Sequence, residues 1–108
     1  MVSSQNRYLF VRADNLAPAL NLPRTTLEVR RNDRSGFITI TNKGVYTALF
    51  VWLEDDREIG AQGYVYFDDN HFCLLPNETR SIAVAWNNVP EDERRLSIAG
   101  WNTDTEYV

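Results

Sequence analysis

Residues 66–79 constrain the fold more than any other part of this chain. Short apolar runs alternate there with turn-forming residues, in the order Tyr66-Phe67-Asp68-Asp69-Asn70-His71-Phe72-Cys73-Leu74-Leu75-Pro76-Asn77-Glu78-Thr79. Pro76 presets φ at one central position of a turn, and Asn77 tolerates the left-handed conformation at the next. The stretch therefore predicts two short strands around an acidic kink, a tight turn and the start of a third strand, as in an antiparallel sandwich.

The remainder of the chain shows the same alternation of short apolar runs and turn residues. Helix signals are nearly absent, apart from one turn expected at 90–94, where Pro90 suits a first helical position. The spacing of the turns predicts an all-β fold, an immunoglobulin-like antiparallel β-sandwich of about seven strands. Strands are expected at 8–11, 26–30, 37–41, 48–53, 79–86 and 96–101, with two more within 64–75.

Three positions carry specific packing predictions. The run 48–53 is apolar at every position, which is typical of a strand covered on both faces, either central or packed by a neighbouring domain. Trp86 is in phase with Ile82 and Val84, which favours a core position. Cys73 lies among apolar neighbours and is expected to be a small buried residue.

Size and charge exclude several classes of protein. The chain has 108 residues, one cysteine and a net charge of −4, with no basic stripe. It fits one domain, excludes an internal disulfide and argues against binding to nucleic acid. No apolar run is long enough for a transmembrane helix, so no membrane partner is expected. Residues 1–6 lack the pattern of a signal peptide, and the start of the chain resembles a cut made within a longer protein.

Several motifs resemble one family in the right order along the chain. Residues 67–78 are similar to a family pattern F-S-D-N-Y-F-x-L-L-P-G-E, 37–44 to V-T-V-T-N-T-G, 47–53 to P-A-L-F-V-R-L and 100–102 to G-W-N. Residues 6–11 and the connector to Pro23 are similar to N-x-Y-x-F-x followed by L-x-L-P. The family is the C-terminal immunoglobulin-like domain of family 2 glycoside hydrolases of the β-mannosidase and exo-β-glucosaminidase type. This sequence departs from it at Asn77, which replaces a turn glycine, and at His71, which replaces a tyrosine.

The resemblance implies a non-catalytic accessory domain of a multidomain β-mannosidase-like exo-β-glycosidase, which would act in glycan breakdown. Residues 1–24 would be a leading strand and a proline-containing connector from a preceding domain, and residues 25–108 the sandwich. The partners implied are the catalytic (β/α)8 barrel and neighbouring sandwich domains of the same polypeptide, in the periplasm or outside the cell. A retaining site needs two carboxyls about 5 Å apart, and a barrel needs about 250 residues. No catalytic residue, cofactor or metal is therefore assigned to this chain.

The acidic corner has three interpretations. Asp68, Asp69 and Asn70 offer oxygen atoms of the kind that Ca²⁺ prefers, but they lack the spacing of a calcium loop. Their side chains can instead accept hydrogen bonds from loop amides, as in Asx turns. A third interpretation is that this corner faces the missing barrel. His71 is expected to be an interface or loop histidine rather than a catalyst.

The aromatic residues leave a second class of function open. Rings can stack on sugars, so a stand-alone carbohydrate-binding module that uses surface aromatics, with an oligosaccharide as ligand, is the alternative. A free-standing adhesion domain is a third possibility. A docking domain should expose an apolar patch and bind no sugar, whereas a binding module should bind sugar alone. The candidate residues for domain docking or sugar contact are Trp52, Tyr64, Asp68, Asp69, Asn70, His71 and Trp101.

Overall fold

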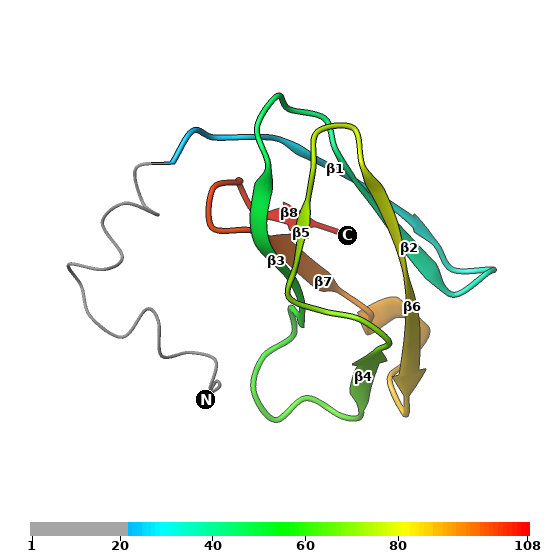
Figure 1. Cartoon of the computed structure of the whole chain (residues 1–108). Coiled ribbons are helices and arrows are strands. Elements are labelled where there is room, and N and C mark those ends of the chain that lie inside the picture. Colours follow the sequence, from blue (N-terminus) through cyan, green and yellow to red (C-terminus); the bar gives the residue numbers. More distant parts are fainter. Residues whose placement is uncertain (1–21) are drawn as a thin grey trace.

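The computed structural model describes residues 22–108, which form two four-stranded sheets packed face to face (Figure 1). The first, called here the β6 sheet, has the order β1-β2-β6-β4, and the second, the β3 sheet, has the order β5-β3-β7-β8. The β6 sheet contains β1 (Leu27–Asn32), β2 (Phe37–Asn42), β6 (Thr79–Asn87) and β4 (Tyr64–Phe67). The β3 sheet contains β5 (Phe72–Leu74), β3 (Ala48–Asp55), β7 (Leu96–Ala99) and β8 (Glu106–Tyr107), and one 3-10 turn, η2 (Glu91–Glu93), joins the sheets.

Paired neighbours within both sheets run antiparallel, and local turn chemistry sets their register. In the β1–β2 hairpin, the Asn32 side chain accepts hydrogen bonds from the amides of Arg34 and Ser35, and the Gly36 amide donates to the Asn32 carbonyl. Gly36 has a φ of 77°, a conformation that glycine adopts without a steric cost. The hairpin then places alternate β2 side chains toward the opposite sheet.

One apolar core fills the space between the sheets. Ile38 and Ile40 of β2 belong to this core together with Val51 and Leu53 of β3, and all four side chains are almost completely buried. Burial of apolar area in such a core is the dominant force that stabilises a sandwich. Trp86 packs against this core from β6, so the core position predicted from its phase is confirmed.

Two buried asparagines hold one end of the sandwich together. Asn42 is fully buried; its amide donates to the carbonyls of Tyr46 and Leu74, and its oxygen accepts from Thr25 and Gly44. These four bonds tie β2, the loop that follows it, β5 and the segment that leads into β1. A buried polar side chain with all its partners in place specifies one arrangement of the surrounding backbone.

The second buried asparagine, Asn102, holds the point at which the chain enters the sandwich. Its side-chain amide donates to the carbonyls of Pro23 and Thr47, and its oxygen accepts from the amide of Leu49. Its own carbonyl accepts from the Thr25 amide, beside a parallel bridge between Thr25 and Thr103. The N-terminal end of the described chain is thus fixed beside the first residues of β3.

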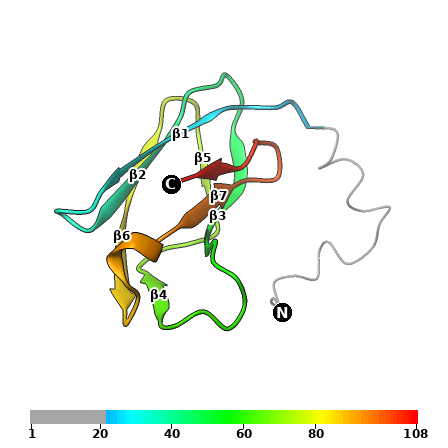
Figure 2. The ribbon, with the colours of Figure 1, turned by 180° about the vertical axis from the view of Figure 1, so that it is seen from behind.

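Most strands predicted from the sequence are confirmed. The structure has β1, β2, β3, β4, β5, β6 and β7 where alternation indicated strands, and η2 where one helical turn was expected. Asn77 has a φ of 66°, as its turn role requires. The strand predicted at 8–11 lies outside the described residues. The sequence reading missed β8, a two-residue strand that pairs with β7 and lies close to β1, as Figure 2 shows from behind.

The structure corrects one packing prediction and confirms part of another. Cys73 is exposed rather than buried, because its neighbours Phe72 and Leu74 point into the core and the side chains of a strand alternate. For the run 48–53, the central position is confirmed, because β3 lies inside its sheet and its inner side chains are buried, whereas within the described residues its outer face leaves Phe50 38% exposed.

Candidate interaction surface

A β-bulge in β3 determines what its outer face presents. The register with β5 shifts between Ala48 and Val51, so Leu49 and Phe50 lie outside the regular alternation. Phe50 has a φ of 50°, and a bulky residue with a positive φ is a genuine outlier. Bulges of this kind re-aim side chains. Here the bulge directs the Phe50 ring outward while Ala48 and Val51 remain completely buried.

The Phe50 ring packs against Trp101. The ring centroids lie 4.5 Å apart at an interplanar angle of 43°. The Trp101 amide donates to the Leu49 carbonyl, which brings the segment after β7 against the bulge. A Cβ atom added to Gly100 would lie 2.9 Å from the same carbonyl oxygen, so only glycine permits this approach. The Gly100-Trp101-Asn102 motif thus places the Trp101 ring against Phe50 and bonds the Asn102 side chain to the Leu49 amide.

More side chains continue this surface across the β3 sheet. Trp52 pairs with Ala99, Glu54 pairs with Ser97, and Ser97 pairs in turn with Tyr107. Cross-strand partners share a face, and the neighbours of these residues point into the core. Trp52 is half-buried and donates from its indole nitrogen to Glu54, and Tyr107 is 67% exposed. This outer surface is called here the aromatic face, and it consists of Phe50, Trp52, Trp101 and Tyr107, with Cys73 on the adjoining strand β5.

Tyr64, predicted together with Trp52 as a docking residue, lies elsewhere. It belongs to β4, the edge strand of the other sheet, where Tyr64 and Tyr66 are 59% and 62% exposed. The structure therefore brings Trp52 and Trp101 onto one sheet but leaves Tyr64 on the opposite one. Sequence alternation could not reveal this, because it gives the phase of a strand but not the sheet to which the strand belongs.

Asn70 is committed to the backbone at the acidic corner between β4 and β5. Its side-chain oxygen accepts from the Leu53 amide at 2.7 Å, and its amide donates to the Leu53 carbonyl at 3.0 Å. The side chain thus acts as an additional rung on β3. The amide of His71 also donates to the Asn70 oxygen, and His71 is exposed with a φ of 59°. The predicted Asx-type role is confirmed for Asn70.

The two carboxylates of the corner are also engaged. Asp68 accepts from the Ala83 amide, and Asp69 accepts from the Asn70 amide and from the Arg80 guanidinium, each at 2.8 Å. These contacts attach the corner to β6. Among residues 22–108, no three His, Cys, Asp or Glu side chains gather closely enough to hold a metal ion. The corner is built as a structural joint between the two sheets.

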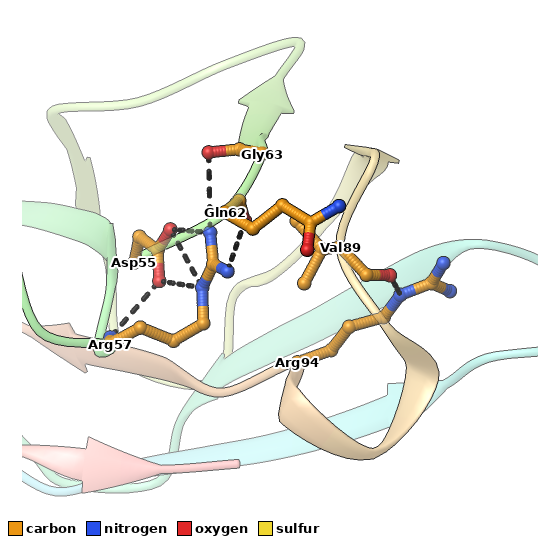
Figure 3. A network of polar contacts seen from close by, with 6 residues as sticks. All are labelled: Asp55, Arg57, Gln62, Gly63, Val89 and Arg94. Carbon is orange, nitrogen blue, oxygen red and sulfur yellow. Dashed lines mark hydrogen bonds and ion pairs between the residues drawn. The ribbon is translucent and has the colours of Figure 1, made fainter. Parts of the chain in front are cut away.

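An ion pair that the sequence did not predict, between Asp55 and Arg57, lies at the end of β3. Arg57 donates from two nitrogens to Asp55 and also donates to the carbonyls of Gln62 and Gly63, as Figure 3 shows. Its side chain is only 3% exposed. The Arg57 guanidinium beside Asp55 holds the pKa of that carboxyl below its usual value. The signal was an Asp-x-Arg sequence directly after an apolar strand, and the pair fixes the connector from β3 to β4.

A hollow of about 160 Å³ lies near the start of β7 and is lined by side chains that include Trp86, Arg31 and Arg94. Both guanidinium carbons lie within 6 Å of the Trp86 ring centroid. Arg31 donates to the Arg94 carbonyl and Arg94 to the Val89 carbonyl, the second bond being drawn in Figure 3. These contacts hold the 88–95 loop against the end of the sandwich. The two guanidinium groups also lie over the Trp86 ring, so this ring is not available for stacking on a sugar.

Comparison with known proteins agrees with this architecture. No helix within residues 22–108 is both long and apolar enough to cross a bilayer. No curated protein and no solved structure shows a significant match to the chain. A family model, Ig_mannosidase, described as an Ig-fold domain, matches residues 18–100. That match covers most of the 108 residues, so the chain belongs to the family of immunoglobulin-fold domains found in family 2 glycoside hydrolase mannosidases.

Proposed function

We propose that this chain is a non-catalytic accessory domain of a multidomain, β-mannosidase-like exo-β-glycosidase. In this role it packs beside the catalytic barrel and neighbouring sandwich domains of the same polypeptide and stabilises them. The observation that carries the proposal is the match of residues 18–100 to the mannosidase-type immunoglobulin-fold family. The role is inferred from family membership, since a fold alone does not determine a function.

The chemistry of the described residues supports an accessory role. Retaining hydrolysis uses two carboxyl groups about 5 Å apart, facing one sugar bond. Here Asp68 and Asp69 accept hydrogen bonds from backbone amides, and Asp55 is paired with Arg57. These carboxylates are used to join strands and loops. Phe50 and Tyr107, the two exposed rings of the aromatic face, are in contrast of the kind that marks contact with another protein.

The alternative, a carbohydrate-binding module, draws on a different observation. Tyr64 and Tyr66 stand two residues apart on β4 and point away from the core, and both are more than half exposed. Amphipathic rings displayed on one side of a strand are suited to stacking on sugars. If this chain binds glycans by itself, the outer face of the β6 sheet is therefore the surface that would contact them.

Titration calorimetry separates the two functions. The domain is titrated with β-manno-, gluco- and chito-oligosaccharides, alongside the variants Tyr66→Ala and Trp52→Ala. The accessory role predicts no saturable heat with any ligand. Saturable heat that is abolished by Tyr66→Ala and retained in Trp52→Ala would support the binding module on the β6 sheet. Saturable heat lost only in Trp52→Ala would assign sugar binding to the aromatic face and contradict its use in docking.

A further inference from the structure

We propose that the aromatic face is the docking site for the sandwich domain that immediately precedes this chain in its polypeptide. This inference rests on the proposed function and adds to it both the surface and the neighbour. It assigns the outer face of the β3 sheet, and not the acidic corner at 68–71, as the main interdomain contact.

The composition of the face favours contact with protein. Phe50, Trp52, Trp101 and Tyr107 gather from β3, β8 and the turn after β7, and Phe50 and Tyr107 are 38% and 67% exposed. Aromatic residues are enriched at the centres of protein interfaces, where burial of their large area contributes most of the binding energy. Glu54 and Ser97 supply polar groups at one border of the face, which matches the polar rim of such interfaces.

Backbone strain at Phe50 adds an independent argument. A phenylalanine with a φ of 50° costs free energy, and residues in such sparsely populated conformations cluster at ligand contacts and other functional positions. A regular strand without the bulge would avoid this cost. In this structure the bulge projects the Phe50 ring outward onto Trp101, and burial of that ring against a partner would offset the strain.

The position of the chain's entrance identifies the partner. Pro23 is bonded to Asn102, and Asn102 directly follows Trp101, so the polypeptide arrives beside the aromatic face. The family resemblance implies that residues 1–24 lead in from a preceding domain. The 22 residues before Pro23 can span at most about 80 Å even if fully extended. A tether of limited length gives the preceding domain a high effective concentration at the face.

Cys73 provides a reporter for this contact, because it is the single cysteine of the chain and lies exposed beside the bulge. The rate of its reaction with a small maleimide is compared in the 108-residue chain and in the longer native polypeptide, with parent cysteines outside this chain replaced by serine. We expect the reaction to be slower in the longer polypeptide by about tenfold or more, because thiol reactivity depends on access. Equal rates would overturn the proposal.

A matched control uses the opposite sheet. In a Cys73→Ser background, Ser81→Cys places a thiol on the exposed outer face of β6. That thiol should react at similar rates in both polypeptides. Protection of both thiols would indicate general shielding and would overturn the assignment of one docking face. In addition, Phe50→Ala in the longer polypeptide should restore Cys73 labelling, whereas Tyr66→Ala should not, and the opposite pattern would overturn the proposal.

The identity of the neighbour is tested separately. In a Cys73→Ser background, Glu54→Cys places a thiol at the border of the face. A benzophenone attached to this thiol is irradiated in the longer polypeptide, with other parent cysteines replaced by serine, and the adducts are mapped by mass spectrometry. Adducts in the domain directly upstream are expected, whereas adducts confined to the barrel would overturn the assignment of the partner. If the native polypeptide contains no upstream domain, the proposed function itself fails. The mass of the native protein therefore separates failure of the proposed function from failure of the docking assignment alone.

Discussion

At the scale of single residues, polar side chains determine how the strands of this sandwich are joined. Asn42, Asn70 and Asn102 each bond to backbone groups of segments far away in the sequence. A buried donor or acceptor left without a partner costs roughly 1–3 kcal/mol. These side chains therefore stabilise the fold mainly because their removal would leave several backbone groups unpaired.

Asn42→Ala should destabilise the domain severely. Four hydrogen bonds would be lost at a fully buried site, so we expect a decrease of about 3 kcal/mol or more in the free energy of unfolding. The matched control is Asn32→Ala, which removes two side-chain bonds to amides in an exposed turn. It should cost less than about 1 kcal/mol. Urea unfolding measures both, and equal losses would contradict the role assigned to Asn42.

The Asp55–Arg57 pair predicts a specific dependence on pH. The pKa of Asp55 is lowered in the folded state, chiefly by the hydrogen bond from Arg57, so the folded state binds a proton less readily than the unfolded state. The stability from this pair is therefore complete above the ordinary pKa of an unfolded aspartate and is lost as the pH falls through the lower folded value. Thermal unfolding of wild type and Asp55→Asn should differ at pH 6 and converge in strong acid. A difference that persists in strong acid would contradict this account.

At the scale of elements, the connector between β3 and β4 depends on one glycine more than on the other. Gly63 has a φ of 79°, and an added Cβ atom would meet the carbonyl oxygen of Asn87 at a distance that no side chain tolerates. Gly60 has a φ of 92° with no atom within 4 Å of such a Cβ. The two glycines thus separate the effect of a steric clash from that of the backbone conformation alone.

Gly63→Ala should accordingly destabilise the domain more than Gly60→Ala does. Gly60→Ala at an exposed site should lower the free energy of unfolding by about 1–2 kcal/mol, the cost of its left-handed conformation alone. Gly63→Ala must also separate β4 from the end of β6, so its cost should be larger. Urea unfolding gives the difference, and hydrogen exchange should show faster opening of Tyr64–Phe67 only in Gly63→Ala. Equal effects in the two variants would refute the proposed role of the close contact with Asn87.

Alternation and turn chemistry predicted most of these elements because they are local properties. The strands β1 to β7 and the turn at Asn77 follow from period-two patterns and from residues that tolerate a positive φ. The bulge at Phe50 could not be predicted, because it results from how β3 pairs with β5. The exposure of Cys73 was misread because apolar neighbours were taken as a sign of burial. The aromatic face was found only in part, since Trp52 and Trp101 were singled out whereas Phe50 and Tyr107 were not.

At the scale of the whole molecule, the two outer faces differ in where their rings lie. The β3 sheet presents the aromatic face at the end where the chain enters, whereas the other sheet presents polar side chains such as Arg30 and Thr39 on β1 and β2 and the exposed rings of Tyr64 and Tyr66 on its edge strand β4. If docking buries the aromatic face, Phe50→Ser should change the stability of the isolated chain little and should lower the melting temperature of the longer polypeptide. Differential scanning calorimetry of wild type and Phe50→Ser in both polypeptides measures the two shifts in melting temperature, and equal shifts would argue against docking.

We propose that this chain works as one domain of a larger glycosidase. The most direct test is the mass of the native protein, detected in extracts of cells that produce it with an antibody raised against residues 22–108. We expect a single polypeptide far heavier than 12.5 kDa, which cleaves a β-mannoside or a related β-glycoside when it is isolated. A native protein of 12.5 kDa would contradict the proposed function.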